Sequence, residues 1–462
     1  MQYYSTNNHK LKVDLKTAIF RGLALDGGLF MPKTIKKLST GTIDTLSKLS
    51  FQEIALAVTS TLLDKYIPKS VLRKMIKNAF FFPCPLRQLD EKLFVLELFH
   101  GPTLSFKDFG ARFMAELFSY FGAKEKKQIT ILTATSGDTG SAVAKAFYKK
   151  LNTKVVVLYP KNKISKIQEK QIATLGENII AVAVKGNFDD CQKLVKTAFQ
   201  DKKLSRRFNL TSANSINIAR LIPQTLYYFW GYAQLKTLYH KPYTLNPIFV
   251  VPSGNFGNLT AGLIAKRMGL PVQFIAATNE NDIIPQYLKT GQWNPLPSKQ
   301  TLSNAMDVGN PSNWARIMDL YNHNLIKIKK DLTAISVSDI ETKKIIKIIY
   351  KKYNYVIDPH TAVGLATVLR PTTYNSQPIT YNLKPKILIV LATAHPAKFP
   401  EIVEKIIHPP KFSFKKLGGI KSKISVPHRL AKCLKKSIKS ITIEPKITAL
   451  KNVLSTYIWR IN

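Results

Sequence analysis

Short runs of β-branched residues alternate with longer helical patterns from about residue 128 onward, and this alternation limits the fold more than any other feature. The predicted strands cover residues 128–133, 154–159, 178–184, 248–251 and 272–276. The predicted helices cover residues 141–150, 165–175, 189–200 and 259–268, and we predict Asp189 as the cap of the helix at 189–200. Such alternation is typical of parallel strands joined by crossover helices. We therefore predict a doubly wound α/β core with mostly parallel sheets.

The segment before this core has a different character. Residues 1–92 contain helical pieces, a turn at Gly27 and Gly28 and a proline-rich exit at residues 82–85. We predict a separate N-terminal cap domain there, followed by a catalytic core of two subdomains at residues 93–400.

Residues 401–462 form a basic extension, because Lys and Arg recur there while no acidic residue lies between Glu404 and Glu444. The pattern leaves the fold and the role of this extension open. Residues 370–384 resemble a surface connection between elements of the core.

The formal net charge of the chain is +41 at pH 7, from 69 Lys and Arg residues against 28 Asp and Glu residues. Such an excess can indicate a nucleic-acid partner or an anionic surface. The basic residues are spread along the whole chain, however, and often occupy the polar positions of a helical pattern, as in residues 341–352. We expect a diffuse, solvated surface charge and no nucleic-acid partner, with a polyanion site as the alternative.

The polar N-terminus, MQYYSTNNHK, lacks the features of a secretory signal. Apolar stretches such as residues 387–394 fall well short of the roughly 20 residues that cross a bilayer. Cys84, Cys191 and Cys433 form no CxxC pair, so neither a disulfide framework nor a thiolate zinc site is indicated. We expect a cytoplasmic protein, and the sequence leaves a monomer or a homodimer open.

Two glycine-containing turns follow predicted strands and precede predicted helices. The first reads TSGDTG at residues 135–140, and the second reads SGNFGN at residues 253–258. Glycines let backbone N–H groups approach an anion closely, and a helix N-terminus adds a favourable dipole. Neither turn matches GxGxxG or GxxxxGK[ST], so a phosphate is favoured over a dinucleotide or a P-loop nucleotide. Either turn alone could be an ordinary loop.

Lys107 lies in the run FHGPTLSFKDFG, just before a helical pattern at residues 111–121. The positive end of the helix dipole and desolvation both disfavour an ammonium, so they are expected to lower the pKa of the Lys107 amine and make it a better nucleophile. A surface lysine beside Asp108 is the alternative, and for an isolated lysine it is the commoner outcome.

The combination of motifs changes this balance. HGPTLSFKDFG is followed in order by LTATSGDTGSA, SANSINIARL, VVPSGNFGN, SNAMDVGNPSN and TAHPAKF. Together they resemble the threonine synthases, which are pyridoxal-phosphate enzymes of fold type II with a tryptophan-synthase-β-like architecture. The resemblance runs from the N-terminal segment, which includes GLALDGGLFMP, to about residue 400.

The resemblance implies pyridoxal 5'-phosphate as the cofactor and Lys107 as the lysine that binds it as a Schiff base. Asp138 matches a position where many relatives carry Asn beside the phenolic oxygen of the cofactor. Thr393 matches the hydroxyl residue that faces the pyridine nitrogen, and a neutral hydroxyl does not force that nitrogen to stay protonated. The residues implied to cradle the cofactor phosphate are Gly254, Asn255, Phe256, Gly257 and Asn258.

The implied substrate is O-phospho-L-homoserine, which carries an α-carboxylate at one end and a phosphate at the other. The residues suited to the carboxylate are Ser136, Gly137 and Thr139. The residues matching positions that contact the substrate phosphate are Asn214, Ser215 and Arg220, and arginine supplies a planar fork for it. For Asn214 and Ser215, a helix cap is the alternative.

The implied reaction eliminates phosphate from the γ-carbon and adds water at the β-carbon to give L-threonine. Lys107 then anchors the cofactor and also moves protons. One alternative is a dehydratase or phospholyase that stops at the 2-keto acid, and another is a nucleic-acid-binding protein on an inactive scaffold. His100, His360 and His395 match no metal-ligand spacing, so no metal is expected.

Overall fold

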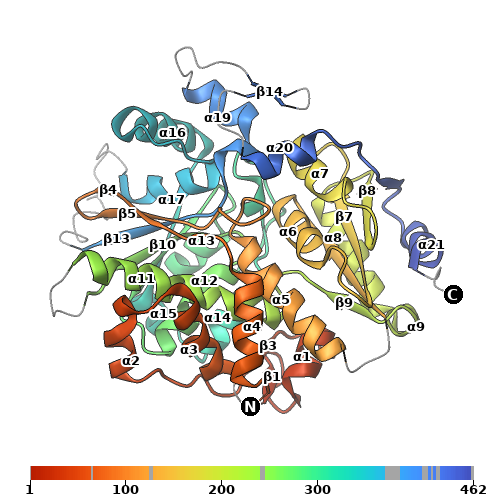
Figure 1. Ribbon diagram of the computed structural model, residues 1–462, viewed down its shortest axis with the longest axis horizontal. Coiled ribbons are helices and arrows are strands. Elements are labelled where there is room, and N and C mark those ends of the chain that lie inside the picture. Colours follow the sequence, from red (N-terminus) through yellow and green to blue (C-terminus); the bar gives the residue numbers. More distant parts are fainter. Residues whose placement is uncertain are drawn as a thin grey trace.

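The computed structural model describes residues 2–63, 66–123, 128–239, 245–369, 386–407, 415–417, 420–422 and 427–458. The surface connection predicted at residues 370–384 lies outside the described residues. Two sheets dominate the molecule, one on each side of the view in Figure 1. None of the described helices combines the length and the apolar character needed to cross a membrane.

The larger sheet has six strands in the order β12 (Leu332–Ser336), β11 (Gln273–Thr278), β10 (Ile248–Pro252), β13 (Leu388–Ala392), β5 (Leu93–Glu97) and β4 (Leu86–Asp90). Its strands are parallel except for β4, which is antiparallel to β5. Strands β5 and β10 are apolar and buried along most of their length, as is typical of a parallel sheet covered on both faces. This confirms the strands predicted near residues 248 and 272.

The smaller sheet has five parallel strands in the order β16 (Ile441–Ile443), β8 (Ile179–Val184), β7 (Thr153–Pro160), β6 (Ile129–Ala134) and β9 (Leu210–Ser212). Strands β6, β7 and β8 are the three that the sequence predicted between residues 128 and 184. The doubly wound α/β prediction is therefore confirmed in both halves of the core.

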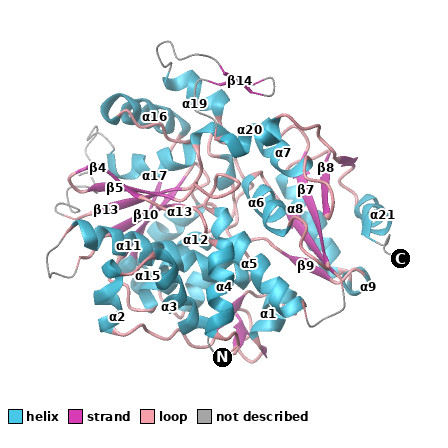
Figure 2. Cartoon of the chain, in the orientation of Figure 1, coloured by secondary structure: helices cyan, strands magenta, loops and turns pink. Residues whose placement is uncertain are grey.

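Helices cover the faces of both sheets (Figure 2). Those that follow β5 and the strands of the smaller sheet are α5 (Lys107–Gly122), α6 (Asp138–Phe147), α7 (Lys166–Ala173), α8 (Phe188–Gln200), α9 (Lys202–Arg207), α10 (Ile218–Leu221) and α11 (Leu226–Leu238). Those of the larger sheet are α12 (Gly257–Arg267), α13 (Ile283–Thr290), α14 (Trp314–Leu320), α15 (Leu325–Asp331), α16 (Asp339–Tyr353) and α17 (Pro359–Leu369). Helices α5 and α6 pack against each other between the two sheets (Figure 1).

The predicted cap of helix α8 is wrong by two residues. The N-cap is Asn187, whose side chain accepts from the backbone N–H of Asp190, while the Asp190 carboxylate accepts from the backbone N–H of Asn187. This reciprocal pair satisfies two backbone donors at once, so it outcompetes a cap at Asp189.

The N-terminal segment forms a small antiparallel sheet and four helices. They are β1 (Tyr3–Ser5), β2 (Lys12–Val13), α1 (Leu15–Arg21), β3 (Phe30–Pro32), α2 (Thr40–Thr45), α3 (Phe51–Leu63) and α4 (Lys69–Ala79). The predicted turn is present, because Gly27 has a φ of +81° and Ala24 N–H donates to the carbonyl of Gly28. Strand β4 precedes residue 92 and yet pairs with β5, and the domain division itself stays a prediction.

The described part of the C-terminal extension contains α19 (Pro400–Ile407), a hairpin of β14 (Lys415–Leu417) and β15 (Ile420–Ser422), α20 (His428–Leu434) and α21 (Ile447–Ile458). Helix α20 packs on α7, helix α21 packs on α8, and β16 pairs with β8 (Figure 1). This extension therefore completes one edge of the smaller sheet.

Candidate active site

One cavity collects nearly all of the residues that the sequence singled out. It is lined by Lys107, Ser136, Asp138, Thr139, Asn214, Ser215, Arg220, Gly254, Asn255, Phe256, Gly257, Asn258 and Thr393, together with residues such as Met306 and His360. They come from the ends of strands and the beginnings of helices, where ligands bind in doubly wound sheets.

Lys107 is the first residue of helix α5, and its amine faces the cavity. The pKa of the Lys107 amine falls to about 8, mainly because the surrounding protein desolvates it. The negative charge of Asp138 acts in the opposite direction and raises the pKa. Lys398 and Arg220 add to the lowering. The Lys107 amine is therefore neutral, and nucleophilic, in a far larger fraction of molecules near neutral pH than an ordinary lysine amine is.

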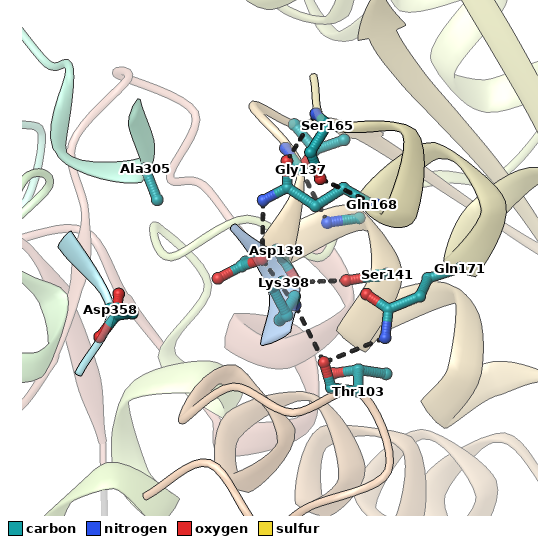
Figure 3. A network of polar contacts seen from close by, with 12 residues as sticks. Thr103, Gly137, Asp138, Ser141, Ser165, Gln168, Gln171, Ala305, Asp358 and Lys398 are labelled. Atoms are coloured by element: carbon teal, nitrogen blue, oxygen red, sulfur yellow. Dashed lines mark hydrogen bonds and ion pairs between the residues drawn. The ribbon is translucent and has the colours of Figure 1, made fainter. Parts of the chain in front are cut away.

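Asp138 begins helix α6 and is 2% exposed. Its Oδ1 accepts a hydrogen bond from Gln168 Nε2 at 2.9 Å and an ion pair from Lys398 Nζ at 2.6 Å (Figure 3). Burial by itself raises the pKa of Asp138. The charges of Lys398 and Lys107 outweigh this effect and hold the pKa well below its usual range. The cavity therefore holds an ionised carboxylate beside Lys107.

The turn at residues 135–140 is held from within. Thr135 Oγ1 accepts from the backbone N–H groups of Gly137 and Gly140, both at 2.8 Å. Gly137 has a φ of +134°, and a Cβ there would lie 2.3 Å from Gln168. Ser136 and Thr139 line the cavity, whereas Gly137 does not, and its N–H already donates to Thr135. In this arrangement Gly137 shapes the loop.

Ser215 is held by two amides of neighbouring loops. Asn255 Nδ2 donates to Ser215 Oγ at 2.7 Å, and Asn313 Nδ2 donates to it at 3.3 Å. Both lone pairs of the hydroxyl are therefore engaged, and its proton is left for an acceptor in the cavity. Asn217 caps helix α10, so the alternative of a helix cap at Asn214 and Ser215 is wrong.

Arg220 is 3% exposed and lies in helix α10. Its Nη1 donates to the carbonyl of Ala213 at 2.6 Å, and its Nε has no hydrogen-bond partner among the described residues. Burial lowers the pKa of Arg220 to about 10, which leaves it a cation at neutral pH. A buried cation that lines the cavity is suited to an anionic ligand.

The turn at residues 253–258 leads directly into helix α12. Phe256 takes a left-handed conformation with a φ of +59°, and its ring packs edge-on against Trp314. Gly254 cannot carry a side chain without movement, because a Cβ would lie 2.6 Å from the backbone Cα of Met306. Asn258 accepts from Ser253 Oγ and donates to the carbonyl of Pro252. The turn thus presents a helix N-terminus to the cavity, as a phosphate site requires.

Family models cover almost the whole chain. Residues 2–80 match the threonine synthase N terminus, residues 80–379 match pyridoxal-phosphate-dependent enzymes, and residues 361–454 match the threonine synthase C-terminal region. The chain belongs to the threonine synthase family.

Relatives and solved structures agree with this membership. The threonine synthase of Buchnera aphidicola subsp. Baizongia pistaciae is 43% identical over 98% of this chain and 99% of its own length. That of Haemophilus influenzae is 47% identical over 88% and 91%. The crystal structure of Escherichia coli threonine synthase matches with a TM-score of 0.87 at 41% identity, over 99% of this chain and 100% of that one. The pyridoxal-phosphate-bound enzyme of Brucella melitensis matches with a TM-score of 0.86 at 33% identity over both whole chains.

The residues of this threonine synthase family member fit pyridoxal phosphate. Lys107 offers an amine with a lowered pKa, the turn at residues 253–258 offers a helix N-terminus, and Thr393 lies at the cavity wall just after β13. The carbonyl of Thr393 accepts from the backbone N–H of Phe106 at 2.9 Å, which ties the Lys107 segment to the same wall. The fold-type-II prediction is confirmed by the family and by the structural matches.

Arg316 is a site residue that the sequence reasoning missed. It is fully buried, and it donates to the carbonyls of Phe30, Ser215 and Ile216 and to the side chain of Asn313. It therefore joins the N-terminal sheet to the Ser215 loop. The motif DVGNPSN ends three residues before it, but nothing in the sequence marks an arginine as buried.

His360 was expected not to bind a metal. Its contacts are with Asp358 and with the backbone of Ala305. Its Nδ1 lies 2.6 Å from Asp358 Oδ2, and its Nε2 accepts from the backbone N–H of Ala305. A neutral ring that donates to Asp358 satisfies both contacts. It fixes the loop around Met306 against the cavity. Among the described residues, no group of His, Cys, Asp and Glu is arranged to hold a metal ion.

Proposed function

We propose that this cavity converts O-phospho-L-homoserine and water into L-threonine and phosphate, the last step of threonine biosynthesis. The observation that carries this proposal is the presence, in one cavity, of Lys107 and two groups of residues suited to anions. One is the helix N-terminus at residues 253–258, and the other is formed by Ser215 and Arg220. A phosphorylated cofactor and a phosphorylated substrate need both.

In this proposal Lys107 holds pyridoxal phosphate covalently, and the residues Gly254, Asn255, Phe256, Gly257 and Asn258 hold its phosphate. When bound, the cofactor supplies an electron sink for charge that develops at the substrate carbons. Thr393 would face the pyridine nitrogen of the bound cofactor, and Asp138 would face its phenolic oxygen. Because its pKa is about 8, the Lys107 amine can both accept and return a proton near neutral pH.

The two ends of the substrate are assigned to different groups of lining residues. Ser136 and Thr139 bind the α-carboxylate with hydroxyl and backbone donors. Asn214, Ser215 and Arg220 bind the phosphate that leaves. Among the described residues the Ser215 hydroxyl accepts from two amides and has no acceptor for its own proton, which supports this assignment.

The decisive experiment measures products. Purified protein loaded with pyridoxal phosphate and given O-phospho-L-homoserine is expected to release phosphate and threonine in equal amounts. Lys107→Ala, which removes the anchor, is expected to release neither. Phosphate with 2-oxobutyrate and no threonine would assign the chain to the phospholyase alternative instead.

We further propose a cytoplasmic enzyme that acts as a monomer or a homodimer and has no nucleic-acid partner. Cys84, Cys191 and Cys433 are free thiols, which suits a reducing compartment. The substrate and the cofactor are both small phosphorylated molecules.

A further inference from the structure

Lys398 is a fully buried lysine that the proposed reaction does not use. It ends a short 3-10 helix at Pro396–Lys398. Its Nζ lies 2.6 Å from Asp138 Oδ1 and donates to the carbonyl of Thr103 at 2.9 Å (Figure 3). A charge buried in the protein interior costs free energy unless an opposite charge lies beside it, and for Lys398 that charge is Asp138.

Asp138 is held in position from several elements. Gln168 Nε2 donates to the same oxygen, Oδ1, at 2.9 Å, and Gln168 itself is fixed by a capping box with Ser165. Ser141 Oγ donates to the backbone carbonyl of Asp138. Figure 3 shows these donors converging on Asp138. Since both side-chain donors use Oδ1, Oδ2 is the oxygen left for a ligand in the cavity.

The charged groups around Lys107 come from four other elements and from its own helix. Asp138 on α6 is the carboxylate that raises its pKa, and Lys398 and Arg220 are the cations that lower it. On its own helix, Asp108 is occupied by two hydrogen bonds from Thr103. At the start of α17, Asp358 accepts from His360 Nδ1, and His360 Nε2 accepts from the backbone N–H of Ala305. Asp138 is thus the carboxylate for which the two lysines compete.

We propose that Lys398 is a positioning residue that takes up the negative charge of Asp138, so that Lys107 keeps a free amine and the cofactor meets a neutral ion pair. This inference rests on the proposed role of Lys107 as the cofactor anchor. An unpaired Asp138 carboxylate would attract the Lys107 ammonium and would repel a phenolate oxygen placed beside it. Asp138 and Lys398 together form an ion pair with no net charge.

A purely structural role for Lys398 is the competing explanation, because its Nζ also anchors the Thr103 carbonyl. The two explanations differ in the sign of their effects. If charge is what matters, removing Lys398 and removing the charge of Asp138 must act in opposite directions. If both charges are removed together, the two effects must cancel.

The test follows the visible absorbance of the protein loaded with pyridoxal phosphate as a function of pH, in Lys398→Met, Asp138→Asn and the double variant. The measured quantity is the midpoint, the pH at which the change in absorbance is half complete. Lys398→Met leaves a bare carboxylate, which stabilises a proton on the Lys107 nitrogen, so the midpoint is expected to rise by about 1 to 3 pH units. Asp138→Asn leaves a bare ammonium, so the midpoint is expected to fall by a similar amount. The double variant is expected to return close to the original midpoint.

Lys266→Met is the matched control. Lys266 pairs with Asp331 at 3.1 Å, is partly exposed and lies outside the cavity lining. Its loss removes a lysine from an ion pair without changing the charge near Lys107. The midpoint of this variant is expected to stay where it is in the unmodified chain.

The inference is overturned if Lys398→Met and Asp138→Asn move the midpoint in the same direction, or if both move it by less than about half a unit. Should Lys398→Met not fold, Asp138→Asn and the double variant still decide, because the fall in the first must disappear in the second. Borohydride treatment of the unmodified chain keeps the two proposals apart. If it attaches the cofactor elsewhere than Lys107, the proposed function itself fails and this inference fails with it.

Discussion

The properties of Lys107 depend both on its local position and on residues that are distant in sequence. Its position at the start of α5 is local and was expected from the sequence. The lowered pKa, in contrast, arises first from desolvation by the surrounding protein and then from Lys398 and Arg220, which are distant in sequence. Neither cation lies near the α5 segment in the sequence.

The pKa of Lys107 predicts how labelling depends on pH. With the cofactor removed, the rate at which pyridoxal phosphate and borohydride label Lys107 is expected to rise with pH, because only the neutral amine reacts. The rate should reach half its maximum near pH 8, well below the value of about 10.4 for an ordinary lysine.

Peptide mapping of the labelled protein measures this rate, and Lys107→Ala supplies the background. A rate that is still rising steeply above pH 9.5, as expected of an ordinary lysine, would contradict the lowered pKa.

At the scale of elements, the turns before α6 and α12 decide the shape of the site. The turn at residues 253–258 needs a left-handed Phe256 and a Gly254 that lies against Met306. The sequence predicted both turns and their helices. It did not show that Met306 lies against Gly254, because that contact joins distant parts of the chain.

Gly254→Ala is expected to weaken cofactor binding. The added Cβ would meet the backbone of Met306 at 2.6 Å, and backbone cannot rotate away as a side chain can. Overpacking of this kind costs about 1 to 3 kcal/mol, which corresponds to roughly 5-fold to 150-fold in affinity. Titration of the apoprotein with pyridoxal phosphate, followed by absorbance, measures the change.

Gly41→Ala is the matched control for this prediction. Gly41 lies in helix α2, and a Cβ there would meet nothing within 4 Å. Its affinity for the cofactor should equal that of the unmodified chain. Equal affinity in Gly254→Ala would show that the loop around Met306 can move aside freely.

At the scale of the whole molecule, the C-terminal extension belongs to the core. Strand β16 pairs with β8, and α21 places apolar residues over the smaller sheet and helix α8. The fold of this segment could not be predicted from the sequence, because its short apolar pattern is interrupted by many lysines. Its buried residues include Leu450, Val453, Leu454 and Ile458.

Leu454→Ala is therefore expected to destabilise the smaller sheet. Leu454 is fully buried, and loss of a buried leucine costs about 2 to 5 kcal/mol of unfolding free energy. Urea unfolding measures the change. Ser455→Ala, at an exposed position one residue away, should leave the stability unchanged. Equal stability of both variants would show that α21 does not contribute to the core.

Local properties of the chain were enough to predict the α/β alternation, the two glycine turns and the place of Lys107, because strand and helix periodicity and turn chemistry are local. The tertiary structure was needed to establish the charge balance, since Lys398 reaches Asp138 across 260 residues of chain. It also decided the burial of Arg316, the contact of Gly254 with Met306 and the place of β16. These depend on which distant segments the two sheets bring together, and a lysine or an arginine in a sequence carries no sign of being buried.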